Sequence, residues 1–185
     1  MKSLKRVCVY CGSSPGVQPR FSEITSKLGK ELVKRKLDLV YGGGGLGLMG
    51  VIARTVLKKG GKVTGIIPKS IVSQTDHLDL SELIVVNSMH ERKAKMFELS
   101  DAFIALPGGF GTLEEILEIV TWAQLGNHDK AVGFLNIEGF YDGLFEFLKY
   151  ATTLKFIKER HLSMIINESD PCILLDALHS FQGSG

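Results

Sequence analysis

The chain alternates short apolar runs with longer amphipathic segments along nearly its whole length. Runs rich in β-branched and aromatic residues occur at 6–10, 37–41, 62–67, 83–86, 102–106, 131–135 and, more weakly, 164–166. Segments with helical periodicity lie between them, at 20–35, 47–59, 89–100, 113–125, 140–151 and 171–181. Buried strands separated by helices are typical of a parallel sheet covered on both faces. The pattern predicts a three-layer α/β fold with a central, mostly parallel sheet of about six or seven strands.

The length and composition fit one domain. A chain of 185 residues matches the usual domain size of about 100–200 residues. Hydrophobic residues make up 44% and charged residues 23%, which excludes disordered and fibrous classes. We expect a single domain over residues 1–182 and a flexible tail at 183–185, with 68–82 as the longest irregular stretch.

Charge and cysteine usage exclude several kinds of partner. The net charge is +2, which gives no basic footprint for nucleic acid, and no apolar run suits a signal peptide or a membrane span. Three cysteines argue against a disulfide framework. Cys8 and Cys11 form a C-x-x-C, but Cys8 lies in an apolar strand rather than at a helix N-terminus, so redox chemistry is disfavoured. The five scattered histidines form no ligand pattern, so we expect no metal, and we expect a cytoplasmic protein.

Glycine is over-represented and clustered. There are 21 glycines, against about 13 at the usual share, and nine of them lie at 42–50 and 108–111. Gly45-x-Gly47-x-x-Gly50 fits the dinucleotide pattern between a strand and a helix. The end of the next strand, Gly65–Lys69, lacks the acid that binds the ribose of NAD. The loop is therefore interpreted as a contact for a nucleotide or sugar phosphate, or else as a tight turn with close packing.

The second cluster, Pro107–Thr112, also joins a strand to a helix. Its glycines permit positive φ, and amides at the start of the following helix suit an anion. Thr112-x-x-Glu115 fits a capping box, as does Ser88-x-x-Glu91, and this places Glu114 and Glu115 in the first helical turn. Asp170-Pro171 predicts another helix start and Gly60 a helix end.

Cations crowd the start of the helix predicted at 89–100. His90, Arg92 and Lys93 lie in its first turn, where each cation is unfavourable by a few tenths to about 1 kcal/mol. A bound anion would offset this cost, and an arginine donates two parallel hydrogen bonds to a phosphate. The alternative is that these side chains simply turn into water.

These features converge on one edge of the predicted sheet. Both glycine loops and the turn at 88–93 follow strands, so they lie at the carboxyl edge, where α/β proteins bind ligands. The edge offers amides and cations for a phosphate, and carboxylates from Glu114 and Glu115. Such a set suits a nucleoside monophosphate whose ribose becomes oxocarbenium-like during N-glycosidic cleavage. Nucleotide binding without chemistry fits equally well.

At these residues the chain resembles the LONELY GUY (LOG) family, the cytokinin riboside 5′-monophosphate phosphoribohydrolases formerly labelled lysine decarboxylases. The matching pieces are Cys11-Gly-Ser-Ser14, Tyr41-Gly-Gly43, Gly47-Leu-Met-Gly50, Ser88-Met-His-Glu-Arg-Lys93, Pro107-Gly-Gly-Phe-Gly-Thr-x-x-Glu115 and Thr121-Trp-Ala-Gln-Leu125. The resemblance implies a Rossmann-like fold, no cofactor, and a homodimer with the site near the subunit interface. It also implies hydrolysis of an adenine-type nucleoside 5′-monophosphate to free base and ribose 5-phosphate.

The resemblance also implies roles for individual residues. Arg92 and Glu115 match the catalytic pair of the family. The implied substrate contacts are Ser13, Gly43, Met89, Lys93, Gly108, Gly109, Phe110, Gly111, Thr112, Leu113, Glu114 and Thr121. Gln74 falls where the family often has a glutamate, and it stays unassigned.

Two other functions are alternatives to hydrolysis. Related Rossmann-like proteins carry molybdenum cofactor without hydrolysing nucleotides, but they are expected to depart from the Arg…GTxxE pattern, which is intact here. Lysine decarboxylation would need a Schiff-base lysine with a partner for the pyridine nitrogen, and the sequence marks out no such lysine. Trp122 is interpreted either as a core residue or as part of a dimer-interface helix.

Overall fold

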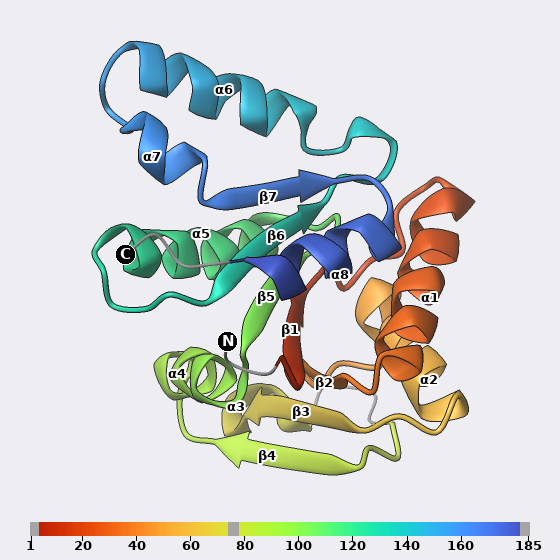
Figure 1. Ribbon diagram of the computed structural model, residues 1–185. Helices are drawn as coiled ribbons and strands as arrows, with labels where there is room; N and C mark the ends of the chain where they lie inside the picture. The colour runs from red at the N-terminus through yellow and green to blue at the C-terminus, as the bar shows by residue number, and fades with distance from the viewer. Residues whose placement is uncertain (1–3, 74–77, 182–185) are drawn as a thin grey trace.

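The computed structural model describes residues 4–73 and 78–181, and its centre is one parallel sheet of seven strands (Figure 1). The strand order is β4-β3-β2-β1-β5-β6-β7, and every neighbouring pair is parallel. The strands are β1 (Arg6–Tyr10), β2 (Asp38–Tyr41), β3 (Val63–Pro68), β4 (Glu82–Val86), β5 (Ala102–Ala105), β6 (Ala131–Leu135) and β7 (Ile165–Glu168). The predicted strands are therefore confirmed, with ends that differ by at most two residues.

Helices cover both faces of this sheet. They are α1 (Pro19–Lys34), α2 (Gly47–Lys58), α3 (Lys69–Val72), α4 (Met89–Leu99), α5 (Phe110–Gln124), α6 (Asp142–Thr153), α7 (Glu159–Leu162) and α8 (Pro171–Ser180), with a 3₁₀ turn at Ile137–Gly139. Apolar side chains of α1, α2 and α8 pack on one face, and those of α4, α5 and α6 pack on the other. This arrangement confirms the predicted three-layer α/β fold of the Rossmann-like type.

The helix ends test the predicted caps. The hydroxyl of Ser88 accepts a hydrogen bond from the Glu91 amide at 3.1 Å, and Asp170 caps α8 by accepting from the amides of Cys172 and Ile173. Gly60, with a φ of 79°, follows the last residues of α2. These three predictions are confirmed.

The cap predicted at Thr112 is wrong. Helix α5 begins at Phe110, its N-cap is Gly109, and no side chain caps it. Thr112 and Glu115 therefore lie inside the helix, and the first turn contains no acidic residue. The prediction failed because glycines at 108, 109 and 111 are typical of a turn, and a threonine followed three residues later by a glutamate is typical of a capping box.

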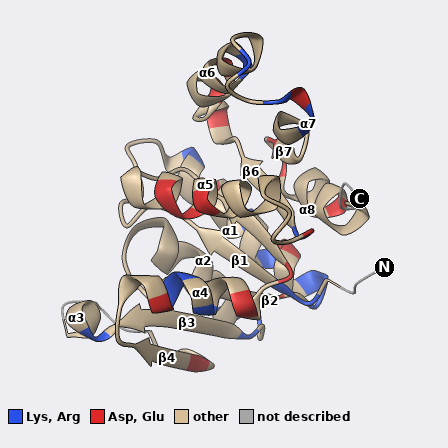
Figure 2. Cartoon of the chain, turned by 90° about the vertical axis from the view of Figure 1, so that its left-hand side faces the viewer, with Lys and Arg blue, Asp and Glu red and all other residues tan. Residues whose placement is uncertain are grey.

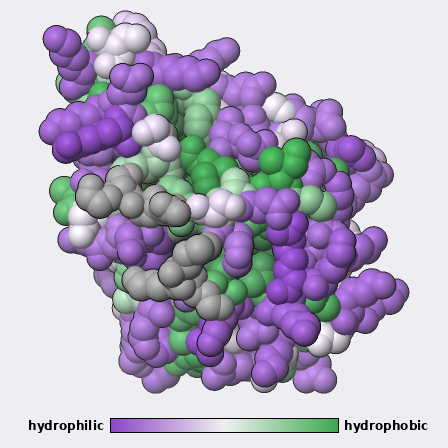
Figure 3. Space-filling model, viewed as in Figure 1, coloured by the Kyte–Doolittle hydropathy of each residue, from purple (hydrophilic) through white to green (hydrophobic). Residues whose placement is uncertain are grey.

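Two short helices, α3 and α7, were not expected from the sequence. The stretch 68–82 was predicted to be irregular, but Lys69–Val72 form the short helix α3. Gln74 and the tail at 183–185 lie outside the described residues. Within the described ranges no helix is long and apolar enough to cross a membrane, and the face drawn in Figure 3 is mostly hydrophilic with smaller hydrophobic patches.

The order in which strands are added to the sheet reverses between β1 and β5. The chain builds β1 to β4 outward on one side and then returns to place β5 on the other side of β1. The loops that follow these two strands touch, because the Gly12 amide donates to the Pro107 carbonyl at 3.0 Å. A crevice at the carboxyl ends of such strands is the usual ligand site of an open α/β sheet.

Candidate active site

Ion pairs join the start of α4 to α5 at this edge of the sheet. The Arg92 Nη1 contacts Glu115 Oε1, and both side chains are almost buried, with 10% and 11% of their surface exposed. Figure 2 shows basic segments of α4 lying beside acidic segments of α5. The structure therefore brings together the two residues that the sequence singled out as a catalytic pair.

Backbone groups hold the guanidinium of Arg92 in place. Its Nε donates a hydrogen bond to the carbonyl oxygen of Ile66, in the second half of β3, at 3.1 Å. A Cβ at Gly42, just after β2, would overlap Arg92 Nη2. Two neighbouring strand ends thus position the arginine, one by accepting a hydrogen bond and the other by leaving space.

Burial controls the ionisation of Glu115. Loss of solvent raises the pKa of its carboxyl above the ordinary value, and the charge and hydrogen bond of Arg92 oppose that rise. The net direction is upward, so Glu115 is a stronger base than an exposed glutamate. A carboxylate with a raised pKa, partly accessible and paired with an arginine, is characteristic of functional sites.

Lys93 forms the second connection between the helices. Its ammonium contacts Glu114 Oε1 and lies 3.2 Å from Glu118. The cations at the start of α4 were interpreted as a sign of a bound anion or as exposed side chains. The structure shows a third arrangement for Arg92 and Lys93, in which carboxylates of the chain itself are their partners.

A cavity of about 340 Å³ lies where the loops after β1 and β5 meet. Ser13, Gly108 and Gly109, all expected substrate contacts, are among its lining residues, and Phe21 and Phe140 are also in its wall. The two phenylalanine rings meet edge to face with their centroids 6.0 Å apart. The cavity occupies the point where the strand order reverses.

Comparisons with known proteins show which family this chain belongs to. A family model described as possible lysine decarboxylase matches residues 49–178. The rice protein named cytokinin riboside 5′-monophosphate phosphoribohydrolase LOG is 50% identical over 164 residues, 88% of this chain and 68% of the relative. LOG1 of Arabidopsis thaliana, named for the same activity, is 47% identical over 96% of this chain and 84% of its own length. The chain belongs to the LONELY GUY (LOG) family.

Solved structures share the fold at lower identity. A molybdenum cofactor binding protein from Rippkaea orientalis superimposes with a TM-score of 0.70 and 21% identity over 95% of this chain and 97% of its own. The molybdenum cofactor carrier protein of Chlamydomonas reinhardtii gives a TM-score of 0.68 and 20% identity, with 95% of each chain covered. These likenesses establish the fold only, because the identity is low.

In this LOG-family chain the second glycine loop presents bare backbone. A Cβ at Gly109 or Gly111 would meet nothing within 4 Å, and neither residue has a positive φ. Gly111 lies in the first turn of α5, where glycine costs about 1 kcal/mol relative to alanine. Neither backbone strain nor crowding within the chain explains these two glycines, which is consistent with a ligand that approaches the amides closely. Gly108 is different, since a Cβ there would overlap the hydroxyl of the buried Thr112.

The first glycine cluster of this LOG-family chain serves packing at several positions. A Cβ at Gly47 would overlap the backbone of Ser13, and one at Gly50 would overlap the Gly45 carbonyl. Gly43 has a φ of 82° and Gly47 a φ of 56°. The interpretation as a tight turn with close packing is therefore supported at these residues, and it also explains how the loop after β1 approaches α2.

Among the described residues, no side-chain hydrogen bond or ion pair joins four other expected substrate contacts to the Arg92–Glu115 pair. Met89 and Phe110, the first residues of α4 and α5, are exposed by 46% and 92%. Leu113 is partly buried and packs against the core. Thr121 is exposed and donates to the Leu117 carbonyl; six residues separate it from Glu115, a rise of about 9 Å along the helix. The structure does not group Thr121 with the paired side chains.

Three features that hold Arg92 and Lys93 in place were not predicted from the sequence. They are the Ile66 carbonyl, the space at Gly42 and the carboxylate of Glu118. Ile66 and Gly42 stand near strand ends and could have been suspected from that position. Glu118 carried a weaker signal, its i,i+4 spacing from Glu114.

A second cavity of about 340 Å³ lies at the opposite edge of the sheet, beside the first residues of β6 and β7, and His128 and Met164 are in its lining. It includes none of the residues singled out from the sequence. Burial disfavours the reactive thiolate form of two cysteines, because it raises the pKa of Cys8 to about 12 and raises that of Cys11 as well. Among the described residues no group of three His, Cys, Asp or Glu side chains could hold a metal ion.

Proposed function

We propose that this protein hydrolyses the N-glycosidic bond of adenine-type nucleoside 5′-monophosphates. The products are the free base and ribose 5-phosphate, and the substrates are cytokinin riboside 5′-monophosphates, AMP or both. The observation that carries the proposal is the buried Arg92–Glu115 pair beside a loop of uncovered glycines. The curated relatives from rice and Arabidopsis are named for this reaction and align with nearly the whole chain.

Glu115 supplies the negative charge that the reaction needs. As the bond to the base breaks, positive charge develops on the ribose, and an adjacent carboxylate stabilises it. Glu115 also accepts hydrogen bonds from the ribose hydroxyls or orients the attacking water. Arg92 holds Glu115 in one orientation, because its own guanidinium is fixed by the Ile66 carbonyl.

The helix start of α5 is suited to the phosphate of the substrate. Amide groups of Gly109, Phe110 and Gly111 stand at the positive end of the helix dipole. Ser13 and Gly108 line the adjoining cavity. In this assignment the phosphate is bound mainly by amides and hydroxyls, and Gly43, Met89 and Thr121 remain proposed contacts on the periphery.

The proposal is tested by looking for the free base. The purified protein is incubated separately with AMP and with isopentenyladenosine monophosphate, and the products are separated by chromatography. We expect adenine or isopentenyladenine together with ribose 5-phosphate. If neither base is released at high enzyme concentration, while a nucleotide still binds, the protein is a carrier and not a hydrolase.

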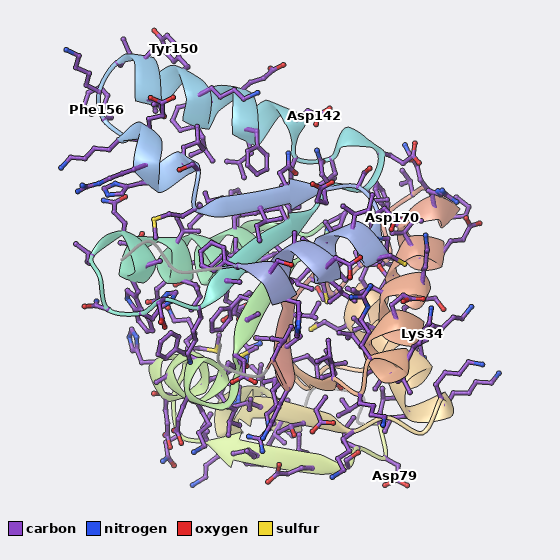
Figure 4. The ribbon with its side chains drawn as sticks, viewed as in Figure 1. Lys34, Asp79, Asp142, Tyr150, Phe156 and Asp170 are labelled. Atoms are coloured by element: carbon purple, nitrogen blue, oxygen red, sulfur yellow. The ribbon has the colours of Figure 1, made fainter. Side chains whose placement is uncertain are left out.

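We also propose that the protein is a homodimer that works in the cytoplasm. Support for the dimer comes from large apolar side chains on the surface, among them Phe110, Tyr150 and Phe156, which are 92%, 61% and 84% exposed. Figure 4 shows Tyr150 and Phe156 pointing away from the rest of the molecule. Three free cysteines fit a reducing compartment. Light scattering coupled to size exclusion should give twice the chain mass, and a monomer mass would contradict the dimer.

A further inference from the structure

Lys93 is enclosed by carboxylates of the neighbouring helix. Its ammonium contacts Glu114 and lies 3.2 Å from Glu118, and only 11% of its side chain is exposed. Glu114 and Glu118 are 55% and 27% exposed. The side chain of Lys93 is therefore the least exposed of the three.

This arrangement conflicts with a direct role in binding phosphate. An ammonium has three donors, and in Lys93 two carboxylates already engage it. If Lys93 turned toward a substrate phosphate, Glu114 and Glu118 would be left without their cation. They are four residues apart on one helix, a spacing at which like charges repel.

The two partners of Lys93 flank Glu115 along α5. Glu114 precedes it by one residue and Glu118 follows it by three, so a cation bound to both fixes how α5 is rotated relative to α4. Arg92, the neighbour of Lys93, meets Glu115 in the same contact. We infer that Lys93 is a positioning residue, which clamps α4 to α5 through Glu114 and Glu118 and so keeps Glu115 aligned with Arg92 and the substrate.

This inference rests on the proposed function, because it assigns Glu115 its catalytic role. Electrostatics gives the clamp a second effect. The positive charge of Lys93 lowers the pKa of Glu115, whereas the charge of Glu114 raises it. Removing the lysine therefore disturbs the position of Glu115 and also raises its pKa.

The experiment compares four variants with the wild-type protein. Lys93→Met removes the clamp, Lys93→Arg retains its charge, and Glu118→Gln weakens it at a residue that no substrate assignment includes. Lys95→Met is the matched control, because Lys95 lies on the same helix and its ion-pair partner among the described residues is Glu98 of that helix. Release of adenine from AMP gives kcat and KM for each variant across a range of pH, and circular dichroism reports folding.

A clamp predicts changes in kcat rather than in KM. Lys93→Met should lower kcat about tenfold to a hundredfold, the scale expected when a reacting group is misplaced by about 1 Å. Loss of activity on the acid side should begin at a higher pH in Lys93→Met, because a positive charge near Glu115 is gone. Glu118→Gln should lower kcat in the same direction to a smaller extent. Lys93→Arg should retain most of the activity, and Lys95→Met should match the wild type.

A phosphate contact predicts the opposite pattern. Lys93→Met would then raise KM for AMP with kcat retained, and Glu118→Gln would leave kcat unchanged. Either result overturns the inference. If Lys93→Met does not fold, the kcat of Glu118→Gln decides the question. A wild-type protein that releases no base would instead refute the proposed function, so the two failures are distinguishable.

Discussion

The guanidinium of Arg92 sits in a space that exists only because residue 42 has no side chain. It touches Glu115 on one side and the Ile66 carbonyl on the other, so it has little freedom to move aside. Gly42 therefore contributes to the site without contacting a substrate. Its own backbone has no positive φ, so an alanine there is not strained by its conformation.

We expect Gly42→Ala to reduce activity while the fold is retained. The new methyl group would overlap Arg92 Nη2 and push the guanidinium away from Glu115, with a loss of kcat on the order of tenfold or more. Gly143→Ala is the control, because a Cβ there meets nothing within 4 Å. Equal kcat in both variants would show that Arg92 is not held as described.

The pH dependence of turnover should reveal the buried carboxylate. Glu115 acts in its ionised form, and burial raises its pKa above the ordinary value of 4.5. As the pH falls through this raised pKa the carboxyl gains a proton, so activity is lost at a higher pH than an exposed glutamate would give. A profile of kcat against pH measures this limb. A limb at or below the ordinary value would contradict the effect of burial.

The sequence identified individual residues of the candidate site, but it did not predict most of the ion pairs that they form. Arg92 and Glu115 stood out through the family motif, and their contact confirms that they lie together. The pairing of Lys93 with Glu114 and Glu118 joins residues more than twenty positions apart. No local pattern specifies which faces of two helices meet, so the cations were linked to an external anion instead.

At the scale of elements, α8 shows how a cap and a tertiary contact combine. Asp170 accepts hydrogen bonds from two amides at the start of α8, and it also pairs with Lys27 of α1 at 2.5 Å. In Figure 4 Asp170 stands at the start of α8 next to α1. The hydrogen bond from Lys27, followed by those from the amides, lowers the pKa of Asp170.

We expect Asp170→Ala to lower the free energy of unfolding by about 0.5–2 kcal/mol near neutral pH, the usual cost of losing an N-cap. Because the folded-state pKa is depressed, the contribution of Asp170 is present above the ordinary value of 3.8 and is lost as the pH falls through the folded value. Urea unfolding at neutral and acidic pH measures both effects. A difference between variant and wild type that persists in strong acid would argue against the ionised cap.

The longer elements were predictable because their periodicity is strong, and the exceptions have local causes. Helices α3 and α7 have four residues each, too few to show a helical period. Helix α5 begins three residues earlier than predicted because Gly109 and Gly111 lack side chains that could indicate a helix. Thr112 and Glu115 imitate a capping box, but the Glu115 carboxylate turns to Arg92.

At the scale of the whole molecule, the order of the strands assembles the site. Residues from the ends of β1, β2, β3 and β5 meet because all strands are parallel and their carboxyl ends share one edge. The strand order reverses between β1 and β5, and the loops that follow these two strands line a cavity where they meet. The sequence predicted that edge, whereas the shape of the cavity depends on Phe21 and Phe140, which come from distant parts of the chain.

In the proposed reaction, the buried pair Arg92–Glu115 promotes cleavage of the N-glycosidic bond. The most direct test is kcat for adenine release from AMP by Glu115→Gln, which keeps the shape of the side chain and removes its charge. We predict a loss of at least about 10²-fold in a protein that remains folded by circular dichroism. Turnover close to that of the wild type would contradict the account.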